Sequence, residues 1–229
     1  MEILNASIVK KLFYTNKELA LFGKWIRLKD IEPLFSKFNS VFDISVLGNS
    51  EEERQILKFK VGSGDKKILL WSQMHGNEST GTKALFDLFN CFLANDSDII
   101  KKILKECTLV FVPMLNPDGS EYYTRVNANN IDLNRDAVDR SAKESKLLRN
   151  LLEEFKPDFC FNLHDQRTIF SVEGTKNPAT ISFLAPSEDL ERTVTKGRTE
   201  TMSVIVAMNE LIQSVLPNQV GRYPHCFVG

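Results

Sequence analysis

The sequence predicts an α/β fold with a mixed, largely parallel central sheet and helices on both faces. Continuous apolar runs at residues 67–71, 108–112 and 159–163 are each as short as a strand that is buried on both faces. Segments with apolar residues at helical spacing lie between these runs. Because strands that alternate with helices form parallel or mixed sheets, the helices are expected to cover both sides of the sheet.

The part of the chain before the first apolar run holds further elements. Residues 17–38 carry apolar side chains at helical spacing, which predicts one or two helices within an N-terminal helical segment of about residues 1–40. Strands are expected near residues 42–47 and 55–61, because Gly48-Asn49-Ser50 marks a turn between them.

The remaining elements follow the same alternation. Amphipathic helices are expected around residues 84–92 and 147–155, and a strand near 180–184 precedes a long helix from about 188 to 216. Residues 113–140 are rich in Asn, Asp, Gly and Arg and show no apolar period, which predicts a long loop. Loops of this length in a compact domain are usually functional or disordered.

The composition is that of an ordinary globular protein. The 229 residues contain 42% hydrophobic and 26% charged side chains, which suits a single domain over 1–229. A net charge of −1 gives no reason to expect nucleic acid or an anionic membrane as a partner. No apolar run approaches the roughly 20 residues of a membrane span, and the first residues do not form a signal peptide. With its four widely spaced cysteines, interpreted as buried free thiols, the protein is expected to be cytoplasmic.

Two segments at predicted strand ends carry side chains that bind metals. The motif His75-Gly76-Asn77-Glu78 follows the strand at 67–71, and His164 follows the strand at 159–163. Open α/β sheets bind their ligands at the carboxyl ends of the strands. Two imidazoles and one carboxylate, with one coordination position left open, form the ligand set of a catalytic zinc site, so Zn²⁺ is the predicted cofactor.

The predicted loop between these segments adds cations and amides. It contains Asn116-Pro117-Asp118-Gly119, then Arg125, then Asp132-Leu133-Asn134-Arg135. A planar guanidinium matches the two oxygens of a carboxylate, and a cation can also stabilise a developing oxyanion. A Lewis acid beside such groups indicates hydrolysis of a carbonyl compound that carries a negative charge. The Asp118-Gly119 pair itself is interpreted as a tight turn without a chemical role.

In these residues the chain resembles the zinc carboxypeptidases of the M14 metallopeptidase family. The resemblance covers residues 67–165 and implies a zinc carboxypeptidase-like fold with His75, Glu78 and His164 as the metal ligands. It implies further that Arg125 polarises the scissile carbonyl, and that Asp132 orients His75. The Asn134-Arg135 pair is expected to hold the substrate's terminal carboxylate, while zinc-bound water hydrolyses the C-terminal peptide or amide bond.

The end of the chain departs from the family pattern. The general base of the family is a glutamate far beyond the third ligand, and no glutamate of this chain occupies that place, so the C-terminal end is expected to be incomplete and the chain shown weak or inactive. Tyr223 is a candidate for the mobile tyrosine that the family uses shortly before that glutamate.

Two alternatives to a carboxypeptidase stay open. Zinc deacylases of the aspartoacylase and succinylglutamate desuccinylase type share the His-Gly-Asn-Glu motif and the Asn-Arg pair, and they cleave small N-acyl amino acids. A zinc-binding module without catalysis is the second alternative. The expected partner is accordingly a peptide or a small acyl-amino acid with a free carboxylate, and no pattern in the sequence predicts an oligomeric state.

Overall fold

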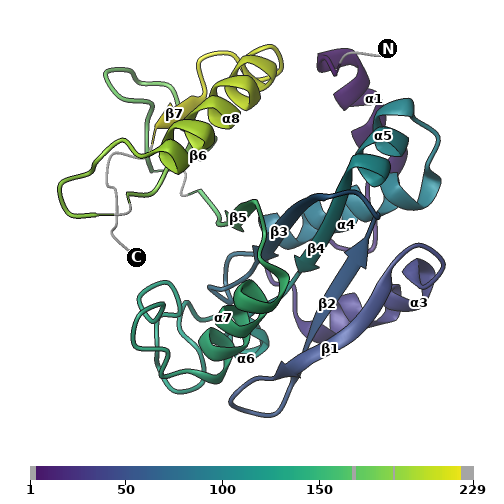
Figure 1. Cartoon of the computed structure of the whole chain (residues 1–229), viewed down its shortest axis with the longest axis vertical. Helices are drawn as coiled ribbons and strands as arrows, with labels where there is room; N and C mark the ends of the chain where they lie inside the picture. The colour runs from purple at the N-terminus through teal and green to yellow at the C-terminus, as the bar shows by residue number, and fades with distance from the viewer. Residues whose placement is uncertain (1–3, 167–168, 188, 223–229) are drawn as a thin grey trace. The chain divides into compact units, whose positions relative to one another are not determined.

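The chain divides into two compact units, and the larger one holds a five-stranded sheet (Figure 1). That unit consists of residues 11–165, and the smaller one of residues 4–10 and 166–222. The single domain expected over 1–229 stays a prediction. The structure, a computed structural model, describes residues 4–166, 169–187 and 189–222.

The sheet has the strand order β1-β2-β4-β3-β5. β1 pairs with β2 and β2 with β4 in antiparallel fashion, whereas β3 is parallel to both β4 and β5. The mixed α/β fold that the sequence predicts is therefore confirmed, although half of the strand pairs are antiparallel. The strands are β1 Asp43–Asn49, β2 Gln55–Val61, β3 Lys66–Ser72, β4 Cys107–Val112 and β5 Phe159–Leu163.

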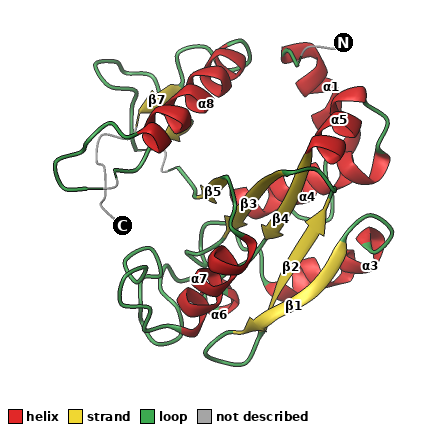
Figure 2. Ribbon diagram, in the orientation of Figure 1, coloured by secondary structure: helices red, strands yellow, loops and turns green. Residues whose placement is uncertain are grey.

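The helices of the larger unit lie around this sheet (Figure 2). Before residue 40, residues 6–16 and 28–38 are helical. Residues 17–27, part of the range in which helices were expected, are not helical. α5 was not among the predicted helices, and a short helix, α6, interrupts the predicted loop over 113–140. These helices are α2 Leu28–Ile31, η1 Glu32–Leu34, α3 Phe35–Phe38, α4 Thr80–Ala94, α5 Asp98–Glu106, α6 Pro117–Glu121 and α7 Lys143–Phe155, while α1 Ala6–Asn16 has residues in both units.

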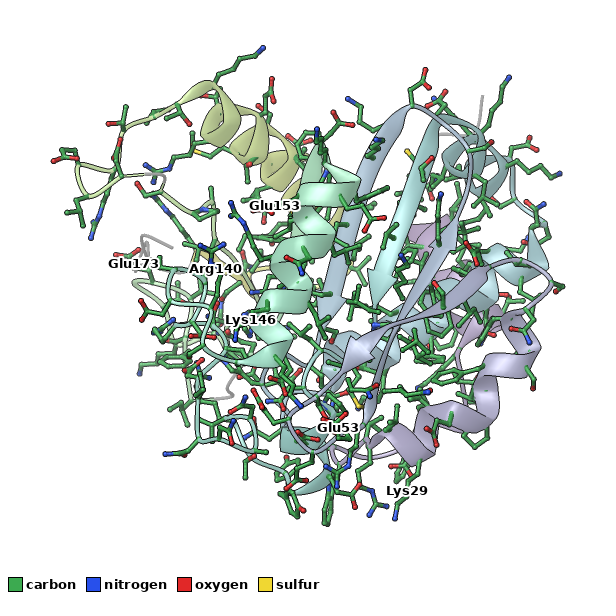
Figure 3. The ribbon with its side chains drawn as sticks, turned by 60° about the horizontal axis from the view of Figure 1, so that its bottom comes forward. Lys29, Glu53, Arg140, Lys146, Glu153 and Glu173 are labelled. Carbon is green, nitrogen blue, oxygen red and sulfur yellow. The ribbon has the colours of Figure 1, made fainter. Side chains whose placement is uncertain are left out.

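One face of the sheet is covered by α7. Leu148 and Leu151 of this helix are buried against Val110 and Val112 of β4 in one hydrophobic cluster. Lys146 and Glu153 on the same helix are polar and exposed, and Figure 3 labels both. An apolar stripe on one side and charges on the other are the pattern of a helix that packs on a sheet.

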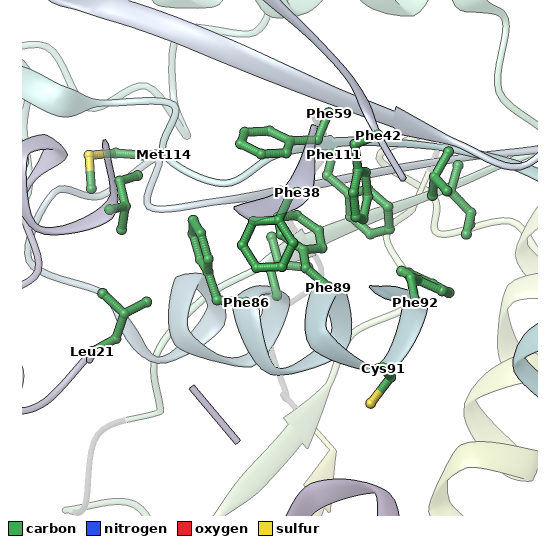
Figure 4. Packing of buried hydrophobic residues seen from close by; sticks show 14 of the residues in the cluster. Leu21, Phe38, Phe42, Phe59, Phe86, Phe89, Cys91, Phe92, Phe111 and Met114 are labelled. Atoms are coloured by element: carbon green, nitrogen blue, oxygen red, sulfur yellow. The ribbon is translucent and has the colours of Figure 1, made fainter. Parts of the chain in front are cut away.

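The opposite face of the sheet carries a core of phenylalanines, which Figure 4 shows from close by. Residues 109 and 111 of β4 point into this core while 110 and 112 point to α7, because successive side chains of a strand alternate between faces. Phe59 and Phe89 stack with ring centroids 5.1 Å apart, and most other pairs meet edge to face. The phenylalanines buried in this core are Phe38, Phe42, Phe59, Phe86, Phe89, Phe92 and Phe111.

The smaller unit holds a two-stranded parallel sheet and one long helix. β6 Ile181–Phe183 pairs with β7 Val220–Arg222, and α8 spans Lys196–Gln213. The predicted strand near 180–184 is confirmed, but the helix begins eight residues later than expected, after Thr195 accepts a hydrogen bond from Arg198 N as its N-cap. Within the described ranges, no helix is long and apolar enough to cross a membrane.

The three cysteines within the described residues are free thiols but differ in burial. Cys91 is buried, Cys107 is half-buried and Cys160 is exposed. The interpretation that all are buried is therefore wrong for Cys160, because β5 is the last strand of the five-stranded sheet and pairs within it on one side only. Cys226 lies outside the described residues.

Candidate metal centre

The two ligand segments meet because β3 and β5 are parallel neighbours. Trp71 pairs with Asn162 and Ser72 with Leu163, so both strands end at the same edge of the sheet. His75 and His164 follow these ends, and their ring centroids lie 4.7 Å apart.

Glu78 joins the two histidines in a compact group. One carboxylate oxygen, Oε2, lies 2.8 Å from His164 Nδ1, and the other, Oε1, lies 3.0 Å from His75 Nδ1. One ligand atom from each of the three residues fits within 4.8 Å of the others. The sequence predicts these residues as metal ligands, and in the structure they lie where one ion could contact all three.

The ring of His75 offers one nitrogen for a metal. Its Nε2 is hydrogen-bonded to Asp132 Oδ1 at 3.0 Å, whereas its Nδ1 is buried and makes no hydrogen bond, although it lies 3.0 Å from Glu78 Oε1. A neutral imidazole that donates from Nε2 keeps a lone pair on Nδ1. A buried nitrogen without a partner is costly unless something else satisfies it, and a divalent cation fits this position.

Arg125 lies beside the same carboxylates. Its Nε donates to Asp132 Oδ2 at 3.0 Å, and its Nη1 donates to Glu78 Oε1 at 3.3 Å. The side chain is 37% exposed, so part of the guanidinium remains accessible to another anion. A substrate oxygen that approaches the metal group would therefore meet a cation.

The charges of the two carboxylates are favoured by their neighbours. Burial alone would raise the pKa of Glu78, but the adjacent His164 and His75 outweigh it and hold the pKa well below its ordinary value. Burial acts on Asp132 in the same way, yet the contacts with His75 and Arg125 lower its pKa. Both groups therefore carry the negative charge that a metal site requires.

Several buried polar residues hold the His75 loop, and sequence reasoning missed most of them. Gln73 is fully buried, adopts a left-handed backbone conformation with φ of 46°, and donates from Nε2 to the carbonyls of Ile26 and Gly76. Asn116, in the motif singled out above, donates to Met74 O and accepts from Gly119 N. A glutamine directly after an apolar strand was the available signal, since a buried amide must find partners.

Asp118 is a buried anchor, whereas the sequence indicated only a tight turn. It lies in α6, is 0% exposed, and accepts hydrogen bonds from Ser50 Oγ at 2.7 Å and from Arg54 Nη1 at 2.7 Å. These partners lie in the turn between β1 and β2, so Asp118 ties that turn to the segment before Arg125.

The remaining predicted site residues are less closely defined. Asn134 N donates to Asp132 Oδ1 at 2.9 Å, which places the Asn134-Arg135 pair directly beside the group around His75. Arg135 is exposed, and its Nη1 donates to Asn134 O. Tyr223 lies outside the described residues.

The chain belongs to the zinc carboxypeptidase family of M14 peptidases, whose model matches residues 28–166. The matched range contains both ligand segments and the loop with Arg125 and Asp132. The three candidate ligands, Arg125 and Asp132 therefore all lie in the part of the chain that matches the family.

Curated relatives are carboxypeptidases of greater length. Carboxypeptidase 2 of Trichophyton rubrum is 29% identical over 102 residues, which are 44% of this chain and 19% of that protein. Carboxypeptidase SOL1 of Arabidopsis thaliana is 28% identical over 133 residues, 52% of this chain and 27% of that protein. The matched stretch thus spans about a fifth to a quarter of these relatives.

Solved structures share the fold at low sequence identity. Carboxypeptidase A from Helicoverpa armigera superposes with a TM-score of 0.68 at 16% identity, over 94% of this chain and 63% of that one. Bovine thrombin-activatable fibrinolysis inhibitor, solved in complex with a tick carboxypeptidase inhibitor, gives a TM-score of 0.70 at 15% identity, over 86% of this chain and 75% of that one. Both likenesses concern the fold.

Proposed function

We propose that this protein is a zinc-dependent carboxypeptidase that hydrolyses the C-terminal peptide or amide bond of a substrate with a free carboxylate. The observation that carries the proposal is the convergence of His75, Glu78 and His164, with Arg125 bonded to the same glutamate. Two imidazoles and a carboxylate leave a coordination position for water or substrate. When bound there, zinc supplies Lewis acidity, which activates water at neutral pH.

Side chains of the protein orient the ligand His75, stabilise the oxyanion and bind the terminal carboxylate of the substrate. Asp132 accepts from His75 Nε2 and so fixes the ring with Nδ1 toward the metal position. Arg125 is placed to donate to the carbonyl oxygen as negative charge develops on it, because Asp132 and Glu78 hold the guanidinium from one side. Asn134 and Arg135 bind the terminal carboxylate, which is the charge that distinguishes the end of a peptide from its middle.

The test compares two substrate classes on the purified full-length protein. We expect one zinc per chain and release of C-terminal amino acids from peptides, with little cleavage of N-acyl amino acids. Replacing Arg125 by Ala should lower kcat by about 10²–10³-fold, the usual cost of removing an oxyanion donor. Arg149→Ala is the matched control, because this exposed arginine pairs with Glu153 on α7 and should leave kcat unchanged.

Each other outcome selects an alternative. Preferential cleavage of N-acyl amino acids would identify a deacylase. Bound zinc without hydrolysis of either substrate class would identify a binding module. A cytoplasmic location is proposed on the sequence features alone and can be checked by fractionation.

A further inference from the structure

The loop between Arg125 and Asp132 closes around one buried asparagine. Asn127 is 3% exposed, and its Oδ1 accepts from the backbone N–H groups of Asn129 at 3.1 Å and Ile131 at 2.9 Å. The backbone of Asn127 bonds to Ile131 as well, from N to O at 3.0 Å. These bonds fix the span of chain that separates Arg125 from Asp132, whose side chains bond to each other.

The remaining polar group of Asn127 faces a buried carboxylate. Asn127 Nδ2 donates to Glu144 Oε2 at 3.1 Å, and Glu144 Oε1 accepts from Glu51 N at 3.3 Å. Glu144 is 0% exposed, and burial raises its pKa. It occupies the first turn of α7, where the helix dipole favours a negative group.

The carboxylate thereby joins three segments that are distant in sequence. Glu51 lies in the turn between β1 and β2, two residues before Glu53, which Figure 3 labels. Glu51 Oε1 accepts from Lys143 N at 2.8 Å, so the turn and the start of α7 hold each other. Of the hydrogen bonds that the side chains of Asn127 and Glu144 make in the described structure, one links the loop around Asn127 to the start of α7. It is the bond between the two side chains themselves.

We propose that Asn127 and Glu144 are a positioning pair, which holds Arg125 and Asp132 at the separation that the metal centre requires. The proposal rests on the proposed function for its effect on catalysis, but its effect on metal binding does not depend on it. The pair touches neither the metal ligands nor the expected substrate position. It acts through Asp132, which orients His75, and through Arg125.

The two side chains differ in one respect that allows an exchange. Asn127 presents a donor to Glu144, and Glu144 presents two acceptors. Asn127→Asp would set two carboxylates against each other, and Glu144→Gln would turn an amide donor toward either Asn127 Nδ2 or Glu51 N. In the double variant Asn127→Asp with Glu144→Gln, every bond is restored: donor and acceptor are exchanged between the two side chains, and the bonds from Asn129 N, Ile131 N and Glu51 N keep their direction. The singles therefore fail for opposite reasons, and the pair rescues them.

The experiment measures zinc affinity, kcat/KM and the melting temperature of the full-length protein. We expect each single variant to bind zinc about tenfold more weakly, as for other groups that orient a ligand indirectly. We expect kcat/KM to fall by about 10–100-fold, because small displacements of catalytic groups have effects of that size. The double variant should recover both values to within about threefold of wild type.

The control is Asn129→Asp, which adds the same charge to an exposed position of the same loop and should change neither value. Zinc affinity is measured well below each melting temperature, so a loss of stability alone leaves it unchanged. Single variants that melt lower but bind zinc and turn over like wild type would overturn the proposal, as would a double variant that recovers neither value. If wild type binds zinc but cleaves no peptide, the proposed function fails, and the zinc measurements still decide this inference.

Discussion

The two histidines of the metal centre occupy different surroundings. His75 follows β3, which lies between two other strands, and it is 1% exposed with Nε2 fixed by Asp132. His164 follows β5, the last strand of the sheet, and is exposed. The same ligand type is thus held rigidly on one side and left open to solvent on the other. The arrangement of the candidate centre is therefore fixed from its buried side, and its other side is open to solvent.

The largest expected effect separates the two sides directly. Both His75→Ala and His164→Ala should abolish tight zinc binding, because each removes one of three ligands. In the presence of a chelator, His75→Ala should lower the free energy of unfolding by about 1–3 kcal/mol, since it removes a buried hydrogen bond to the charged carboxylate of Asp132. His164→Ala should change it by less than about 0.5 kcal/mol. Denaturant unfolding checks this, and equal losses would contradict the comparison.

A smaller effect is expected from the residue that fixes His75. Asp132→Asn should weaken zinc binding by about 10–100-fold, the range for groups that orient a metal-bound imidazole. The exposed Asp139 lies in the same loop, so Asp139→Asn removes the same charge as a control and should leave zinc affinity unchanged. Titration with a competing chelator gives both affinities. Unchanged zinc affinity in Asp132→Asn would mean that the buried side does not depend on this bond.

The smallest effect concerns Asp136, which directly follows the Asn134-Arg135 pair, and it depends on pH. Asp136 is 4% exposed, and its carboxylate accepts from Ser141 N and Ala142 N, each at 2.9 Å, just before α7. Burial opposes its charge, but a hydrogen bond from Ser141 Oγ at 2.6 Å and these backbone hydrogen bonds outweigh burial and lower its pKa to about 2. The ordinary value in the unfolded chain is about 3.9. The stability that Asp136 contributes is therefore present above pH 4 and lost as the pH falls through 2.

Asp136→Asn should remove this dependence. Wild type is expected to lose on the order of 2 kcal/mol more unfolding free energy than the variant between pH 5 and pH 2, which follows from a pKa difference of that size. Urea unfolding at a series of pH values measures the difference. Parallel curves for the two proteins would show that the carboxylate is not held as described.

The sequence predicted the parts of the fold that depend on local pattern. The strands of the five-stranded sheet are confirmed because each one forms a short apolar run or an alternating segment between turn residues. α5 was missed because its apolar residues form one narrow stripe in a short charged segment, of which only Ile100 is buried. Cys160 is exposed because β5 is the last strand of the sheet. The residues of a strand do not specify where that strand lies in the sheet, so the sequence could not predict this exposure.

The same division applies to the candidate site. His75, Glu78 and His164 could be named because their types and strand-end positions suggest a metal site, and the structure brings them together. Their supports could not be named, because a buried asparagine or glutamate has no local pattern that distinguishes it from an exposed one. Asn127 and Glu144 are 17 residues apart, and only the fold gives each of them its partner.

Gly76 decides how closely the turn after β3 can approach α6. A Cβ atom on Gly76 would lie 1.9 Å from the backbone carbon of Gly119, far inside the distance that real atoms allow. A side chain at position 76 would wedge these backbones apart and carry the loop with Arg125 away from the zinc position. Any redesign of this protein must therefore keep glycine at position 76 and vary residues away from this contact instead.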